Sequence, residues 1–169
     1  DYSLYGYKHS IGFAMRGCRF KCSFCVVPKK EGNPKNVNSI FNIWTQRESN
    51  FLMLLDNDFF GNPQWKDCIE EIKEYQLRVN FSQGLNIRII SERQAIALAS
   101  INFRDASNNM PRVNFAWDRI DDERTILRGF RRCVEAGIKP WKMQFFVLIG
   151  FDSTPEEDLH RVETIRSLG

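Results

Sequence analysis

The segment IGFAMRGCRFKCSFC, residues 11–25, joins a short apolar run to three closely spaced cysteines. The run Ile11–Met15 has the length and composition of a buried strand. Cys18, Cys22 and Cys25 therefore lie in one loop directly after a predicted strand. What repeats along the chain after this strand decides the fold class, and the cysteine loop points to the chemistry.

Four further apolar runs follow, and their starts lie about 30 residues apart. That spacing suits one strand and one helix of a parallel sheet, which together take about 30 residues. The runs are Phe51–Leu55, Val79–Phe81, Val113–Trp117 and Met143–Ile149. The pattern predicts an α/β fold with strand and helix alternating five times and with right-handed crossovers.

Helix signals lie between the predicted strands. Capping-box patterns start at Ser91 and at Thr154, and either Asp121 or Asp122 can begin a helix that Gly137 ends. Asn62 and Pro63 can supply an N-cap and a first-turn proline. The predicted helices cover Trp65–Tyr75, Ala95–Ile101, Ile126–Val134 and Leu159–Leu168, with a weaker candidate at Asn38–Glu48.

The length of 169 residues and the ordinary globular composition predict one domain, residues 1–169. No run approaches the roughly 18 apolar residues of a membrane span, so we expect a soluble, cytoplasmic protein without membrane partners. Cys68 and Cys133 fall on apolar helical stripes, which predicts buried, reduced thiols. Residues 1–50 carry eight Lys/Arg against three Asp/Glu, which indicates either a solvated basic face or a surface beside an anionic ligand or nucleic acid.

Polar side chains follow each predicted strand, where parallel strands present their carboxyl ends at one shared edge. Ligands bind at that edge in open sheets and in barrels alike, and the periodicity does not separate these two architectures. Any one of these residues can instead be a helix cap or a turn residue. The set comprises the three cysteines, Asp56, Asn57, Asp58, Gln83, Asn86, Asp118 and Asp152.

Three cysteines within eight residues can face one metal centre from a single loop. A structural zinc site normally takes four protein ligands, and a conventional iron–sulfur cluster takes four cysteines. No second cysteine pair exists in the sequence, since Cys68 and Cys133 are isolated. Three ligands on a four-iron cluster would leave one iron open for a bound molecule. An incomplete zinc site is the alternative.

The loop resembles the signature of the radical SAM superfamily, CxxxCxxC with an aromatic residue before the last cysteine. Here the signature is Cys18-Arg-Phe-Lys-Cys22-Ser-Phe24-Cys25. The resemblance implies a partial (β/α)6 TIM-like barrel, of which about five βα units are present. It also implies a [4Fe–4S] cluster on the three cysteines, with S-adenosylmethionine bound to the open iron through its amino and carboxylate groups. An electron from the cluster would cleave that ligand to a 5′-deoxyadenosyl radical, which abstracts hydrogen from a substrate.

The resemblance also implies roles for residues after the other strands. Many members carry Gly-Gly-Glu after the second strand, whereas this chain has Leu55-Asp56-Asn57-Asp58, which is more similar to the cobalamin-associated and methylthiotransferase-like branch. Asp56 or Asp58 would meet the amino group of the methionine moiety. The other implied cofactor-binding residues are Phe24, Ile149 and Gly150 near the adenine, and Gln83 and Asp118 near the carboxylate or ribose.

These expectations describe a radical SAM core domain that lacks the last strand and any C-terminal extension. Its reaction is left open among oxidoreductase, lyase and transferase chemistry, and its substrate is not identified. A reductant such as flavodoxin or ferredoxin is the expected partner, and the basic residues Arg16, Lys29 and Lys30 would offset the negative charge of a thiolate-bound cluster. The alternatives are a non-catalytic metal-stabilised RNA-binding module and an electron-transfer iron–sulfur protein.

Overall fold

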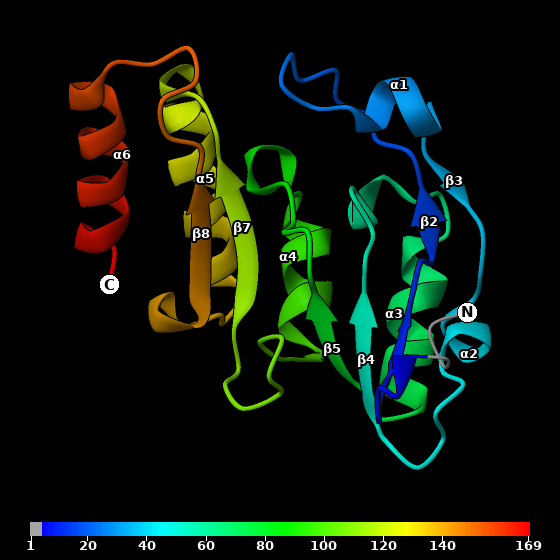
Figure 1. Ribbon diagram of the computed structural model, residues 1–169. Helices are drawn as coiled ribbons and strands as arrows, with labels where there is room; N and C mark the ends of the chain where they lie inside the picture. The colour runs from blue at the N-terminus through cyan, green and yellow to red at the C-terminus, as the bar shows by residue number, and fades with distance from the viewer. Residues whose placement is uncertain (1–4) are drawn as a thin grey trace.

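A computed structural model describes residues 5–169 and shows a mixed α/β fold in which helices pack on parallel strands (Figure 1). The first sheet is parallel and has the strand order β1-β4-β5-β6. A second pair, β7 with β8, is also parallel. The strands are β1 (Ser10–Gly12), β4 (Phe51–Leu54), β5 (Arg78–Phe81), β6 (Asn102–Phe103), β7 (Val113–Trp117) and β8 (Met143–Val147).

The two sets of strands meet between β5 and β7, at an isolated parallel bridge from Leu85 to Phe115. The Leu85 amide donates to the Asn114 carbonyl oxygen over 2.7 Å, and Asn114 Nδ2 donates to the Phe81 carbonyl oxygen over 3.3 Å. Across this joint the strands β1, β4, β5, β7 and β8 lie in the order in which they occur in the chain.

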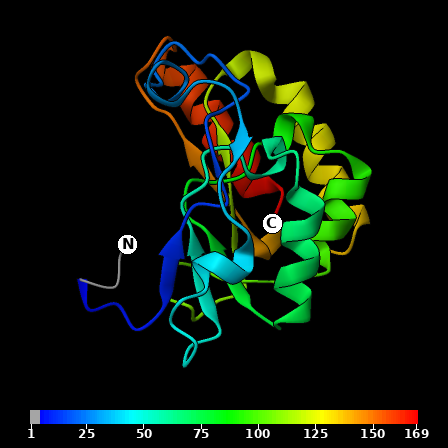
Figure 2. The same ribbon diagram turned by 90° about the vertical axis from the view of Figure 1, so that its right-hand side faces the viewer.

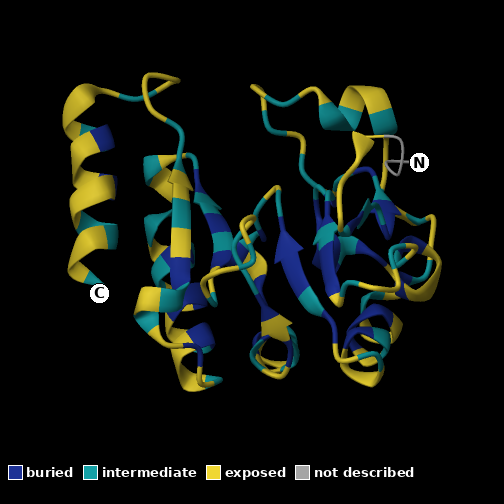
Figure 3. Ribbon diagram, turned by 60° about the horizontal axis from the view of Figure 1, so that its bottom comes forward, coloured by how far each residue is buried: buried dark blue, intermediate teal, exposed yellow. Residues whose placement is uncertain are grey.

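Helices α3 (Trp65–Glu74), α4 (Glu92–Ala99) and α5 (Glu123–Glu135) lie along one face of the strands (Figure 2). Their apolar stripes and the strand residues facing them form one buried core. Helix α6 (Pro155–Ser167) lies beside β8 and is mostly exposed, whereas burial concentrates in the strands (Figure 3). Cys68 on α3 and Cys133 on α5 are buried free thiols, as the helical stripes predict.

The predicted helix ends are confirmed where side-chain caps specify them. Capping boxes with both reciprocal bonds start α4 at Ser91 and α6 at Thr154. Gly137, with a φ of 102°, follows the end of α5. Asn62 does not cap α3, because its side-chain oxygen accepts from the Gln64 amide and the helix begins only at Trp65.

The predicted first strand, Ile11–Met15, is divided in the structure. Its start is β1, and its end is β2 (Met15–Arg16), which turns away to pair antiparallel with β3 (Lys35–Asn36). The remaining segments are short: α1 (Val27–Glu31), α2 (Ile40–Ile43), and the 3-10 helices η2 (Phe59–Gly61), η3 (Ile87–Ile89), η4 (Ile120–Asp122) and η5 (Pro140–Lys142). The predicted helix Asn38–Glu48 is thus reduced to one turn. Within the described residues, no helix is both long and apolar enough to cross a membrane.

Candidate functional site

The parallel strands direct their carboxyl ends toward one edge, where the cysteine loop (residues 17–26) and α1 lie (Figure 1). A cavity of about 310 Å³, called here the cysteine cavity, opens at this edge. Eight of the residues that the sequence places at this edge line it: Cys18, Cys22, Phe24, Cys25, Asn57, Gln83, Asn86 and Asp118. Its other lining residues are Phe20, Val27, Gly84, Leu85, Arg88, Ala116 and Phe146.

The cysteine loop is fixed at both ends by backbone contacts. Gly17 has a φ of 88°, and a Cβ there would lie 2.3 Å from the Asn33 carbonyl oxygen, so only glycine fits. The next amide, that of Cys18, donates to the Gly32 carbonyl oxygen over 3.1 Å. At the other end, the Cys25 amide donates to the Cys22 carbonyl oxygen over 3.0 Å, which closes a turn before α1. The three thiols therefore project from a loop of defined path.

All three cysteines of the loop are free and partly buried. Burial raises the pKa of the Cys18 thiol, and the neighbouring Asp58 and cysteines raise it further, against a hydrogen bond from the Phe20 amide that lowers it. A metal that binds here displaces thiol protons, because the thiolate is the ligand.

The thiols are not arranged around a single ion. Among residues 5–169, no group of three or more His, Cys, Asp and Glu side chains is placed to hold one metal ion. The three free thiols nevertheless line one cavity, and Asp118 is the carboxylate that lines it with them.

Asp56 lies under the cysteine loop rather than in the cysteine cavity. Its Oδ1 accepts from the amides of Ala14 (2.9 Å) and Met15 (3.2 Å), and the residue is only 5% exposed. Those two bonds satisfy amides in the segment where the chain leaves β1, and they account for the division of the predicted first strand. The predicted contact of Asp56 with a ligand is therefore replaced by a contact with the backbone.

Asp58 is also outside the cysteine cavity. Its carboxylate receives the Arg19 side chain in a bidentate pair, with both N···O distances at 2.7 Å. The carboxylate is 2% exposed, so a ligand in the cavity does not reach it. The acidic turn after β4 thus holds the cysteine loop through the contacts of Asp58 with Arg19.

The segment after β8 departs from its predicted placement as well. Ile149 is 63% exposed and neither it nor Gly150 lines the cysteine cavity, where Phe146 contributes instead. Phe151 does lie near the site, because its ring meets Phe24 edge to face with centroids 5.4 Å apart. This aromatic pair lines a second cavity of about 290 Å³ on the outer side of the loop, together with Phe20, Lys21, Cys22, Ser23, Arg88, Arg119 and Asp152.

Asp118 supplies the carboxylate of the cysteine cavity, and Arg88 supplies a cation. Burial raises the pKa of Asp118, against the attraction of Arg88 and Arg161, which lowers it. Arg88 is held by Asp122 at 2.8 Å and stacks over Phe20 at 4.9 Å from the ring centroid. One wall of the cavity therefore offers an acidic and a basic group, with amides from Asn57, Gln83 and Asn86 beside them.

The basic residues near the cysteines differ in their surroundings. Arg16 is paired with Glu31 at 2.6 Å and stacks on Phe13, so its charge is largely matched. Lys29 and Lys30 lie exposed in the last turn of α1. Lys30 reaches a third cavity of about 380 Å³ that adjoins the cysteine cavity and shares Val27, Asn57 and Gln83 with it.

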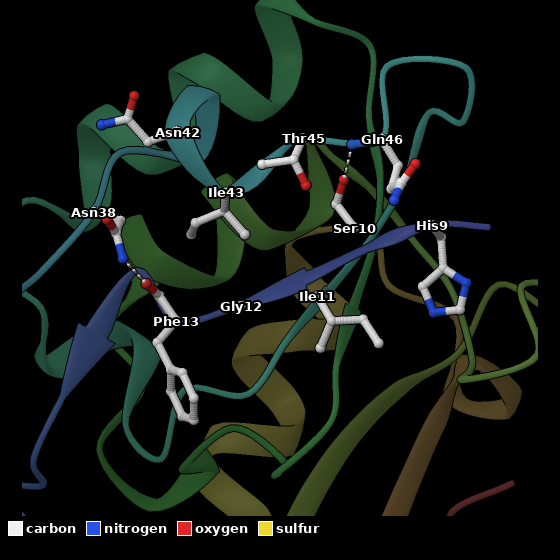
Figure 4. Close-up of a pocket in the computed structure, with 10 residues that line it drawn as sticks. All are labelled: His9, Ser10, Ile11, Gly12, Phe13, Asn38, Asn42, Ile43, Thr45 and Gln46. Carbon is white, nitrogen blue, oxygen red and sulfur yellow. Dashed lines mark hydrogen bonds between the residues drawn. The ribbon is translucent and has the colours of Figure 1, made fainter. Parts of the chain in front are cut away.

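A separate cavity of about 270 Å³ lies between β1 and the segment that carries α2 (Figure 4). Its lining contains His9, Ser10 and Thr45 but no cysteine and no carboxylate. His9 and Ser10 are adjacent on an extended chain and point to opposite sides, so they do not form a nucleophile–base pair (Figure 4). The Ser10 hydroxyl instead accepts from the Gln46 amide over 2.8 Å. This cavity therefore lacks the thiols and the carboxylate that line the cysteine cavity.

The sequence does not predict the roles of two arginines at or beside the site. Arg19, inside the cysteine motif, and Arg88, on a 3-10 helix, have partners distant in the chain. The motif spacing marks the position of Arg19 but not its role. Asn57 and Asn86, by contrast, belong to the polar set that the sequence predicts at this edge, and both line the cysteine cavity.

No protein-family model and no curated protein sequence matches the chain.

Proposed function

We propose that the chain is the core of a radical SAM enzyme, in which Cys18, Cys22 and Cys25 hold a [4Fe–4S] cluster and S-adenosylmethionine binds beside it. One observation carries the proposal: the three free thiols share a single cavity with Phe24, Gln83 and Asp118 at the carboxyl edge of the strands. That is the edge at which ligands bind in parallel α/β folds.

The proposal includes a partial (β/α)6 barrel as the architecture. In a doubly wound open sheet the strand order reverses at a switch point. Here β1, β4, β5, β7 and β8 follow one another without reversal, with the Leu85–Phe115 bridge as the joint. Helices α3, α4 and α5 also lie on one face of the strands (Figure 2). Both features favour a barrel segment over a doubly wound sheet.

The cluster, when bound and reduced by a donor such as flavodoxin or ferredoxin, supplies the single electron that cleaves S-adenosylmethionine to methionine and a 5′-deoxyadenosyl radical. The protein residues bind and orient. Asp118 is the carboxylate available to the cationic part of the ligand, since Asp56 and Asp58 are occupied elsewhere. Gln83 and Arg88 offer a hydrogen-bond donor and a cation to its carboxylate, and the Phe24–Phe151 pair offers an apolar surface to its adenine.

Anaerobic reconstitution tests the proposal. We expect about four iron and four sulfide per chain, and formation of 5′-deoxyadenosine from S-adenosylmethionine with dithionite. Replacing Cys18, Cys22 or Cys25 with Ala should abolish both, because each supplies one thiolate. Cys133→Ala is the matched control, since this buried thiol on α5 does not line the cavity and the variant should retain iron and sulfide.

Two outcomes contradict the proposal. Colourless protein that binds zinc and is unaltered by reductant indicates a metal-stabilised binding module. A reduced cluster whose EPR spectrum does not change on adding S-adenosylmethionine indicates an electron-transfer protein.

A further inference from the structure

The second residue of the cysteine motif is tied to the turn after β4 by a bidentate ion pair. Arg19 Nε donates to Asp58 Oδ2 and Arg19 Nη2 donates to Oδ1, each over 2.7 Å. The Arg19 backbone amide also donates to Oδ2, over 3.2 Å. A planar guanidinium facing a carboxylate through two parallel bonds fixes both distance and orientation. One buried carboxylate therefore restrains the side chain and the backbone of the residue next to Cys18.

The surroundings of this pair leave it little room to move. The Asp58 side chain is 2% exposed, whereas that of Arg19 is 35% exposed. Gly61, in η2, packs directly against both partners: a Cβ there would lie 2.2 Å from Asp58 Oδ2 and 2.8 Å from Arg19 Nε. The absence of a side chain at position 61 lets the carboxylate and guanidinium meet under the loop.

We propose that Asp58 and Arg19 are positioning residues, which hold Cys18 in the place that a three-cysteine centre requires. This inference rests on the proposed function. In it, neither residue contacts the ligand, and the pair acts through the position of Cys18. The Asp58–Arg19 pair holds the start of the cysteine loop in place. The hydrogen bond from the Cys18 amide to the Gly32 carbonyl oxygen sets the direction in which the loop leaves Gly17. Partners that orient metal ligands in this way are worth about 10- to 100-fold in metal affinity.

Charge alone predicts a different pattern from positioning. The Asp58 carboxylate raises the pKa of Cys18, so it opposes a thiolate. By charge alone, Asp58→Asn would favour the anionic centre and Arg19→Lys would leave it unchanged. Positioning predicts that both variants weaken the centre, because each breaks the bidentate geometry.

The test measures the rate at which a ferrous chelator removes iron from reconstituted protein. We expect about 10- to 100-fold faster loss from Asp58→Asn and from Arg19→Lys than from the wild type, with an altered EPR spectrum of the reduced centre. Lys73→Gln is the control, since it breaks the exposed Lys73–Glu70 pair on α3 and should release iron at the wild-type rate. Arg19→Lys also covers the case in which Asp58→Asn does not fold, because the Arg19 side chain is one-third exposed.

The outcomes separate the two hypotheses. Wild-type protein that takes up no iron overturns the proposed function, and this inference with it. Wild-type protein that holds iron while Arg19→Lys holds it equally well overturns the inference alone. Slower release from Asp58→Asn than from the wild type overturns it in favour of a charge effect.

Discussion

Asp56 is a carboxyl group in a place where its charge is costly. Burial raises its pKa to about 7, although the amides of Met15 and Ala14 and the charge of Arg16 act in the opposite direction. Its second oxygen, Oδ2, is buried without a hydrogen-bond partner among the described residues. The unfolded chain ionises this group near its ordinary value of 3.8, so the folded protein binds the proton more tightly.

Asp56 therefore makes the metal-free protein less stable as the pH rises from about 4 to about 7, with a flat dependence above that range. Asp56→Asn keeps an oxygen for the Ala14 and Met15 amides but cannot ionise. We expect this variant to lose the part of the fall in unfolding free energy between pH 4 and 7 that Asp56 causes, which is at most about 4 kcal/mol. Urea unfolding at a series of pH values gives the free energy of unfolding as a function of pH. If that free energy has the same slope against pH for the wild type and the variant between pH 4 and 7, the prediction is wrong.

At the residue scale, the sequence predicts which side chains arrive at the site better than it predicts their partners. Gln83 and Asp118 follow strands and line the cysteine cavity together with the cysteines. Asp56 and Asp58 follow a strand as well, but they take the Ala14 amide and Arg19 instead. The position of a residue directly after a strand predicts the edge of the sheet at which it lies. The hydrogen-bond partner of its carboxylate depends on which donors the fold brings close to it.

In helix α5, the residue type at position 129 is determined by the close packing of the helix on η3. Gly129 lies in its interior, where alanine is favoured over glycine by about 1 kcal/mol in an exposed helix. A Cβ at Gly129, however, would lie 2.1 Å from the Ile87 carbonyl oxygen of η3. Glycine is needed here because α5 packs on the backbone of η3.

Gly129→Ala should destabilise the protein by about 1–3 kcal/mol, since α5 must move away from η3. The free energy of unfolding in urea measures the change. Arg131→Ala, at an exposed position of the same helix, is the control and should stay within about 0.5 kcal/mol of the wild type. A Gly129→Ala variant more stable than the wild type would show that helix propensity outweighs the contact.

At the element scale, the repeated apolar runs predict β4, β5, β7 and β8 within a few residues, because each run contributes apolar side chains to the core, although β8 is fully buried only at Met143. The division of the first run into β1 and β2 could not be predicted, since it depends on the distant Asp56 carboxylate. The two-residue strands β3 and β6 are too short to carry a periodic pattern.

At the scale of the whole molecule, Arg161 attaches helix α6 to the strands at the β8 end. This side chain is fully buried and donates to the carbonyl oxygens of Trp117 (3.0 Å) and Leu148 (2.7 Å), and also to Asp158. It thereby joins the ends of β7 and β8 to α6. The sequence predicts α6 but not this contact, because an arginine in an amphipathic pattern normally faces solvent.

Arg161→Met should lower the urea midpoint of unfolding markedly, because two buried carbonyl groups and the Asp158 carboxylate lose their donor. Arg166→Met is the control, since Arg166 is exposed on the same helix and its replacement should shift the midpoint little. Equal shifts in the two variants would show that the buried contacts of Arg161 contribute no more than an exposed side chain.

The joint between β5 and β7 has a practical consequence for identifying the substrate. Gly84 and Leu85 on one side of the joint and Ala116 on the other line the same cavity. A molecule that fills this cavity contacts both sets of strands and stabilises the folded chain by RT ln(1 + L/Kd), where L is its free concentration and Kd its dissociation constant. Screening compound collections by melting temperature, with the reconstituted protein under anaerobic conditions, will therefore detect small molecules that bind there before any turnover assay exists.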